Sequence, residues 1–154
     1  MPVPNGALVG FDVIVDDPMA EREGYPEAAR LIDDDLGCAK LAPGAADYVI
    51  VATQHKGGQQ SMLRALRSPA PFIALIASTK RSGLVLDYMR KEDVTDLTRV
   101  HAPAGLDLGA KASEEIAPSV LSEIVLHRRG GSGEPMREKS QHRTSGDAMT
   151  EAAA

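Results

Sequence analysis

The chain has few aromatic residues and few chemically reactive side chains. Phenylalanine and tyrosine make up 3% of its 154 residues, and tryptophan is absent. Its hydrophobic residues, 43% of the total, are therefore almost all aliphatic, so we expect a core of aliphatic side chains. The single cysteine, Cys38, cannot form a disulfide within the chain, which is typical of proteins from a reducing compartment.

Long apolar runs and familiar catalytic motifs are also missing. No apolar run approaches the ~20 residues that a membrane-spanning helix needs, and no signal peptide is recognisable, so we expect no membrane partner. HExxH, G-x-S-x-G and Walker A patterns do not occur, and no G-x-G-x-x-G follows a strand. The formal net charge of −5 argues against a nucleic-acid-binding surface over the whole molecule.

What the sequence does contain is an alternation of apolar strands and amphipathic helices. Strands are predicted at 11–15, 48–53 and 72–76, helices at 60–67, 80–91 and from Ser113 onward, a short last strand at 99–100, and a helix end or minor strand at 28–32. Spacings of roughly two dozen residues predict right-handed crossovers and a parallel α/β sheet. The continuous apolar run at 48–53 predicts a strand buried on both faces.

Polar loops follow each predicted strand. In parallel sheets ligands bind beyond the carboxyl ends of the strands, so these loops converge on one candidate site. Asp16 can accept a hydrogen bond from a ribose hydroxyl, or it is a solvated strand end. Ser78, Lys80 and Arg81 offer donors to a phosphate, or they cap a helix and expose their charges. His101 as a general base needs a hydrogen-bonded partner, and a purely structural role is the alternative.

The segment 100–122, VHAPAGLDLGAKASEEIAPSVLS, joins a turn-rich loop to a helix. Pro103, Gly105 and Gly109 punctuate the loop. Ser113 is predicted as the N-cap, with Glu114 and Glu115 at the positive end of the helix dipole. Such a helix start often holds a phosphate-bearing ligand, and a plain helix start packed on a sheet is the alternative.

Four stretches carry a family resemblance: FDVIVDDP, DYVIVATQ, FIALIAS and RVHAPAGLDLGAKASEEIAPSVLSEIV. They resemble the C-terminal, Rossmann-like domain of the XdhC/CoxI family, the accessory proteins of xanthine and carbon monoxide dehydrogenases. The resemblance implies a Rossmann-like domain over 11–129 with helices on both faces of its sheet. Residues 1–10 are then a remnant of a first helix or disordered. Residues 130–154, rich in Gly, Ser and charge, are predicted to be disordered.

The resemblance also implies a function. Such proteins are cytoplasmic maturation factors, chaperones rather than enzymes, that bind molybdenum cofactor (molybdopterin), help its sulfuration and pass it to a molybdenum hydroxylase client. No catalytic or metal-binding residue is expected, and a nucleotide is the alternative ligand. The cofactor-binding positions that we expect are Asp16, Thr53, Gln54, Ser78, Lys80, Arg81, His101, Pro103, Gly105, Asp107 and Gly109.

One departure from the family bears on assembly. The family domain begins with a strand, a glycine-rich turn and a helix that have no counterpart here. Strands 11–15 and 48–53 are expected to flank the place of that strand and to expose their edges. We therefore expect the chain to pair with a copy of itself or with a separate N-terminal XdhC-type subunit, or to start further upstream. The alternatives are an NAD(P)-binding oxidoreductase-like domain and a truncated, non-functional fragment.

Overall fold

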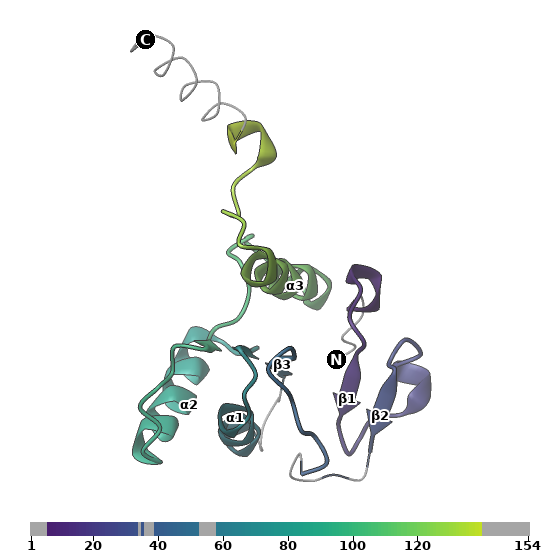
Figure 1. Cartoon of the computed structure of the whole chain (residues 1–154), viewed down its shortest axis with the longest axis vertical. Helices are drawn as coiled ribbons and strands as arrows, with labels where there is room; N and C mark the ends of the chain where they lie inside the picture. The colour runs from purple at the N-terminus through teal and green to yellow at the C-terminus, as the bar shows by residue number, and fades with distance from the viewer. Residues whose placement is uncertain (1–5, 34, 36–38, 53–57, 140–154) are drawn as a thin grey trace. The chain divides into compact units, whose positions relative to one another are not determined.

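The computed structural model describes residues 6–33, 35, 39–52 and 58–139 (Figure 1). The chain divides into two compact units, Met1–Ile124 and Val125–Ala154, with the boundary inside the last helix. The elements in chain order are η1 Ala7–Val9, β1 Ile14–Asp16, η2 Arg22–Gly24, β2 Arg30–Ile32, β3 Tyr48–Val51, α1 Gly58–Arg67, β4 Phe72–Leu75, α2 Thr79–Lys91, β5 Val100–His101 and α3 Ser113–Arg129.

The described strands form two parallel sheets. One has the order β1-β2 and the other β3-β4-β5, which confirms the α/β prediction. Among the described strands, β1 and β3 are not hydrogen-bonded to each other, as the sequence led us to expect. In the common doubly wound order 3-2-1-4-5-6, these five strands correspond to positions 3-2 and 4-5-6.

The first strand is shorter than predicted and begins later. It starts at Ile14, and Phe11 lies outside it, with its ring edge-on to the Tyr48 ring at a centroid distance of 5.6 Å. Its three residues pair with the three residues of β2. The ambiguity at 28–32 is resolved as a strand, since Arg30–Ile32 pairs with β1.

The doubly buried strand is β4 and not β3, contrary to the prediction. All four residues of β4 are at most 1% exposed, whereas in β3 only Val51 is buried. The reason is position in the sheet: β4 has strands on both sides, and β3 has a described neighbour on one side only. A continuous apolar run does not distinguish these two positions.

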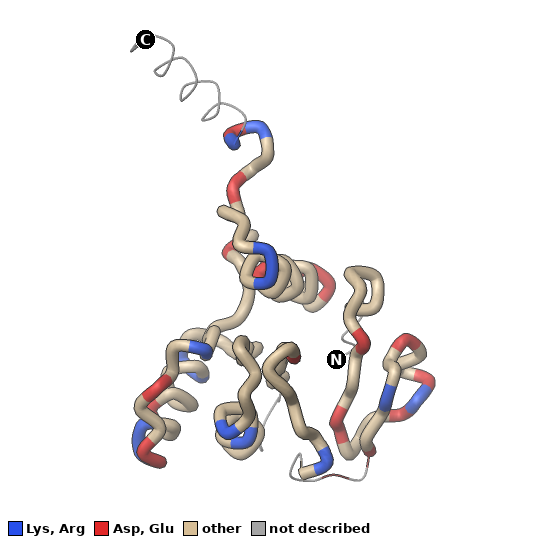
Figure 2. Tube along the Cα trace, in the orientation of Figure 1, with Lys and Arg blue, Asp and Glu red and all other residues tan. Residues whose placement is uncertain are grey.

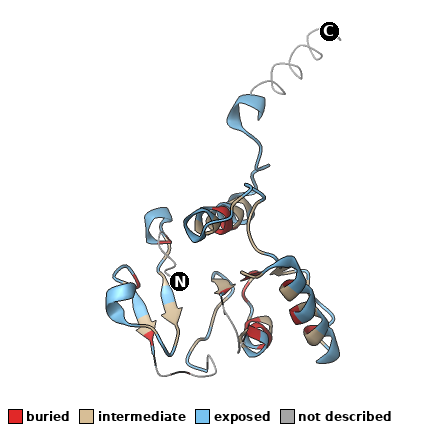
Figure 3. Ribbon diagram, turned by 180° about the vertical axis from the view of Figure 1, so that it is seen from behind, coloured by how far each residue is buried: buried red, intermediate tan, exposed pale blue. Residues whose placement is uncertain are grey.

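Helices cover both faces of the three-stranded sheet, as predicted. Ile73 and Leu75 of β4 pack with residues of α1 and α2, while the alternate residues Phe72 and Ala74 pack with Val120 and Ile124 of α3. Because side chains alternate along a strand, β4 supplies both cores. Figure 3 shows the buried residues along the inward sides of these helices.

The start of α3 differs from the prediction. Ser113 is the first helical residue and not the N-cap. Oε2 of Glu115 instead accepts hydrogen bonds from the backbone N–H groups of Lys111 and Ala112, at 2.9 and 3.1 Å. A side chain two residues inside the helix therefore satisfies amides ahead of it, as in one half of a capping box.

The second unit is described as far as Lys139. Its first residues complete α3, which ends at Arg129. The next residue, Gly130, has φ +68°, and its N–H donates to the Leu126 carbonyl at 2.8 Å. Residues 136–139 form a helical turn. The predicted disorder of 130–154 stays a prediction, and residues 140–154 lie outside the described part. None of the described helices combines the length and apolar character that crossing a bilayer would require.

Candidate functional site at the carboxyl edge of the sheet

The carboxyl ends of β3, β4 and β5 are level. Val51 is in register with Leu75, and Ala74 with His101. Beyond the strands, the N–H of Ile76 donates to Val51 O at 2.9 Å, and the N–H of Ala104 donates to Leu75 O at 3.0 Å. The loops that follow β4 and β5 therefore leave from the same edge, where the sequence placed the site.

The loop after β4 leads into the first turn of α2. The side chain of Ser78 caps this helix, with its Oγ accepting from the Arg81 N–H at 3.3 Å. Lys80 is exposed, and the first turn contains no acidic residue. In the described part, segments of positive and of negative residues are interspersed along the trace (Figure 2). The turn thus offers cations and a helix N-terminus, while the Ser78 hydroxyl is engaged in the N-cap hydrogen bond.

His101 at the end of β5 has the partner that a functional histidine requires. Its ring stacks on Phe72 at a centroid distance of 3.9 Å and an interplanar angle of 23°. Its Nδ1 lies 2.7 Å from Oε1 of Glu123 on α3. The two side chains are 27% and 18% exposed, so the pair is mostly shielded from water but reaches the surface.

The loop 102–110 is fastened to α3 by further bonds. The Gly105 N–H donates to the second Glu123 oxygen, Oε2, at 2.6 Å. Ser119 Oγ donates to Leu106 O at 2.5 Å, and the Leu106 N–H donates to Ser119 O at 3.3 Å. Gly105 has φ +107°, and a Cβ built there would overlap Ser119 Oγ. Both the backbone conformation and the close approach to α3 therefore require glycine.

The remaining predicted residues of this loop are more exposed. Pro103 follows a cis peptide bond, and its side chain is exposed. Asp107 Oδ1 accepts from the Gly109 N–H at 3.2 Å, and Gly109 has φ +70°. Asp107 and Gly109 thus form a local turn, whereas His101 and Gly105 are brought together through Glu123.

One further predicted residue belongs to the other sheet, and two lie outside the described part. Asp16 is the last residue of β1, in the other sheet, and both of its carboxylate oxygens are buried. Thr53 and Gln54 lie outside the described residues. Within the described ranges, no three His, Cys, Asp or Glu side chains gather in a way that could hold a metal ion.

Sequence reasoning missed the two α3 residues that hold the loop, Ser119 and Glu123. They are four residues apart and therefore lie on one face of the helix. The neighbouring positions Val120 and Ile124 are buried against the sheet, at 2% exposure each. A polar pair beside a buried apolar pair was visible in the sequence, but nothing there indicated that it faces the loop after β5.

At the start of α3, backbone amides stabilise the ionised form of the Glu115 carboxyl. The two backbone N–H groups of Lys111 and Ala112 hold the pKa of Glu115 below its usual value. The carboxylate is therefore the form that the folded chain stabilises at this end of α3.

Comparisons with known proteins identify the family of the chain. The family described as the XdhC Rossmann domain matches residues 3–124. The uncharacterized protein YqeB of Escherichia coli K12 is 30% identical over 144 residues, 88% of this chain and 26% of that protein. A Bacillus subtilis 168 protein, described as a probable subunit of xanthine dehydrogenase, is 30% identical over 131 residues, 80% of this chain and 38% of that protein.

A solved structure shows the same fold. A Bacillus halodurans protein described as a xanthine dehydrogenase superposes with a TM-score of 0.72 at 24% identity, over 83% of this chain and 40% of that protein. The chain thus spans between about a quarter and two fifths of the relatives it matches. Because the family match covers most of the chain, the chain belongs to the XdhC Rossmann-domain family.

Proposed function

We propose that this chain is a cofactor-handling accessory protein of a molybdenum hydroxylase system of the xanthine or carbon monoxide dehydrogenase type. In this role it binds molybdenum cofactor in the cytoplasm, helps its sulfuration or insertion, and has no turnover chemistry of its own. The molybdenum hydroxylase is its client. Family membership and the name of the Bacillus subtilis relative support the link to xanthine dehydrogenase.

The observation that carries the proposal is the pair of loops at one edge of the sheet. The first turn of α2 supplies Lys80, Arg81 and a helix N-terminus and itself contains no acidic residue, a donor set that suits the phosphate of a pterin cofactor. The loop after β5 leaves the same edge of the sheet, and its hydrogen bonds to α3 hold it in one shape. In this proposal the loop contacts the pterin ring. The donor set therefore fits molybdopterin. When bound, that group would supply the molybdenum–dithiolene chemistry of the client.

A pair of double variants tests the proposal. In Lys80→Ala/Arg81→Ala, molybdopterin binding should weaken about tenfold or more, because two charged contacts to phosphate are lost. Lys80 is exposed and the N-cap bond of Ser78 uses only the backbone of residue 81, but Arg81 has a further interaction. The free energy of unfolding of the double variant is therefore measured beside its affinity. Binding is measured by isothermal titration with purified molybdopterin.

The matched control removes two cations from the other end of the same helix. Arg90 and Lys91 lie in the last turn of α2, so Arg90→Ala/Lys91→Ala changes the net charge equally without touching the proposed site. The control should bind molybdopterin as the wild type does. Equal affinity in the Lys80→Ala/Arg81→Ala variant would remove the α2 turn from the site.

A further inference from the structure

Both oxygens of the Glu123 carboxylate are engaged by donors from one loop. Oε1 lies 2.7 Å from His101 Nδ1, and Oε2 accepts from the Gly105 N–H at 2.6 Å. These donors lie 22 and 18 residues before Glu123 in the chain. The contacts are short, as expected for hydrogen bonds to an ionised carboxylate. Glu123 therefore connects α3 to the beginning and the middle of the loop.

The carboxylate constrains the imidazole chemically. An ionised carboxylate only accepts hydrogen bonds, so His101 Nδ1 must carry the proton of this contact. In the neutral ring, Nε2 then carries a lone pair and accepts hydrogen bonds rather than donating them. Stacking on Phe72, which is 0% exposed, fixes the plane of the ring as well.

We infer that Glu123 is a positioning residue: it holds His101 in the Nδ1–H tautomer and residues 101–105 in one conformation, and this conformation of the loop is the one that binds the cofactor. The tautomer and loop statements stand on the contacts alone. The part about cofactor binding rests on the proposed function.

The hydrogen bonds of Ser119 separate the role of Glu123 from that of simply attaching the loop to α3. Ser119, one helical turn before Glu123, holds Leu106 through both its hydroxyl and its carbonyl. The loop would therefore stay attached to α3 if Glu123 were altered, while the ring of His101 and the Gly105 amide would lose their common acceptor. A change at Glu123 should thus act on the tautomer and on one amide more than on the fold.

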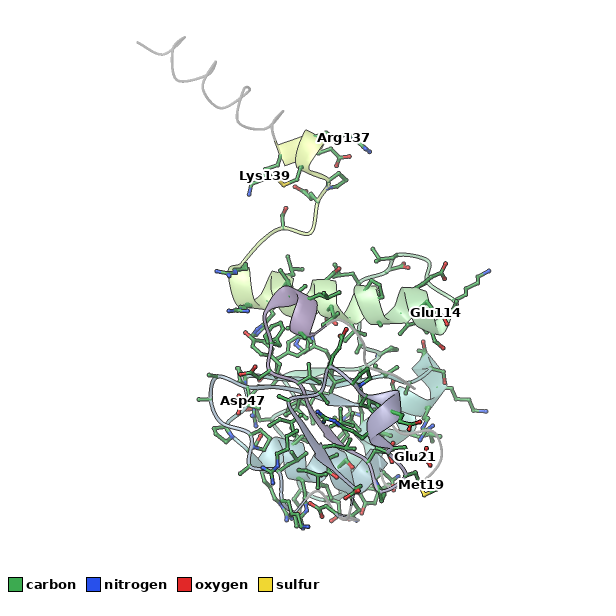
Figure 4. All side chains as sticks on the ribbon, turned by 90° about the vertical axis from the view of Figure 1, so that its right-hand side faces the viewer. Met19, Glu21, Asp47, Glu114, Arg137 and Lys139 are labelled. Atoms are coloured by element: carbon green, nitrogen blue, oxygen red, sulfur yellow. The ribbon has the colours of Figure 1, made fainter. Side chains whose placement is uncertain are left out.

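The test uses Glu123→Gln and Glu123→Ala with Glu114→Gln as the control. Glutamine keeps the volume of glutamate but has one acceptor oxygen, so it cannot serve both donors. Glu114 lies in the exposed first turn of α3, and its replacement removes the same charge (Figure 4). The first readout is long-range proton–nitrogen NMR of the ¹⁵N-labelled imidazole together with the Gly105 amide resonance, with His101→Asn for assignment.

The wild type and Glu114→Gln should show the Nδ1–H tautomer and a strongly hydrogen-bonded Gly105 amide. Glu123→Gln should lose one of the two signatures, and Glu123→Ala should lose both, with circular dichroism unchanged. An Nε2–H tautomer in the wild type, or both signatures intact in Glu123→Ala, would overturn the inference.

The second readout is molybdopterin binding, which should weaken about tenfold in Glu123→Gln and stay within about twofold in Glu114→Gln. Unchanged binding in Glu123→Gln, alongside a changed tautomer, would overturn the part about cofactor binding. Failure of the wild type itself to bind molybdopterin would count against the proposed function and leave the NMR result standing.

Discussion

Replacing Gly105 by alanine should destabilise the loop after β5 for two separable reasons. Gly105 has φ +107°, a conformation that L-residues rarely adopt, which costs about 1–3 kcal/mol. The new Cβ would also overlap Ser119 Oγ and lie 3.4 Å from the backbone N of Val120, so α3 or the loop must move. Overpacking of this kind typically costs about 1–3 kcal/mol, giving roughly 2–6 kcal/mol in total.

Gly109 in the same loop provides the comparison. It has φ +70° and nothing within 4 Å of the position of a Cβ, so Gly109→Ala carries only the backbone cost of about 1–2 kcal/mol. The difference between the two variants contains the close approach to α3 together with any difference between the two backbone costs, so a second comparison separates them. Ser119→Ala removes the overlapping hydroxyl, so Gly105→Ala/Ser119→Ala should be less destabilised than the sum of the two single variants.

Urea unfolding followed by circular dichroism measures all four free energies of unfolding. We expect Gly105→Ala to lose clearly more than Gly109→Ala, and the double variant to show a favourable coupling. Equal losses in the two glycine variants, or strict additivity with Ser119→Ala, would show that the loop does not approach α3 as described.

Three further outcomes are expected. The Arg99 guanidinium donates to three carbonyls at the end of α1 and before β4, at 2.6–2.9 Å, so Arg99→Ala should lose about 2–4 kcal/mol in urea unfolding. Arg99→Lys should be more stable than Arg99→Ala but less stable than the wild type, because an ammonium lacks the planar fork of the guanidinium. A lysine variant as stable as the wild type would contradict this. Hydrogen bonds from the Lys111 and Ala112 backbone lower the pKa of Glu115 in the folded state. The Glu115 carboxylate therefore stabilises the fold above the ordinary glutamate pKa, and this contribution is lost as the pH falls through the lowered pKa of the folded state. The free energies of unfolding of the wild type and Glu115→Gln should therefore differ at neutral pH and converge in acid. A difference that does not change with pH would contradict this. Finally, β1 and β3 each have a described partner strand on one edge only, so light scattering should detect assemblies larger than one chain. A monomer that unfolds cooperatively would argue against this.

The sequence predicted the element types well where hydrophobic periodicity is strong. The helices α1 and α2 and the strands β3 and β4 lie within two residues of the predicted ranges. It misjudged which strand is central, because the apolar runs at 48–51 and 72–75 look alike and only the neighbours of each strand distinguish them. It also placed the cap of α3 on Ser113, since local propensity does not show that Glu115 reaches back to the preceding amides.

The candidate site was predictable in outline but not in its supporting contacts. The convergence of loops follows from the parallel order of strands, and His101 was selected for its place at a strand end. Glu123 was not selected, because its contacts with His101 and Gly105 join residues about twenty positions apart. Such a pair is set by how α3 lies against β5, which no local pattern encodes.

In the proposed function, the two loops at the carboxyl edge of the sheet bind a pterin cofactor for a molybdenum hydroxylase. Native mass spectrometry of the chain, purified from cells that also produce such an enzyme, tests it most directly. We predict a bound species that is released on denaturation and has the mass and fluorescence of a molybdopterin derivative. A nicotinamide dinucleotide in its place, or a protein that carries no pterin beside a fully loaded hydroxylase, would contradict the account.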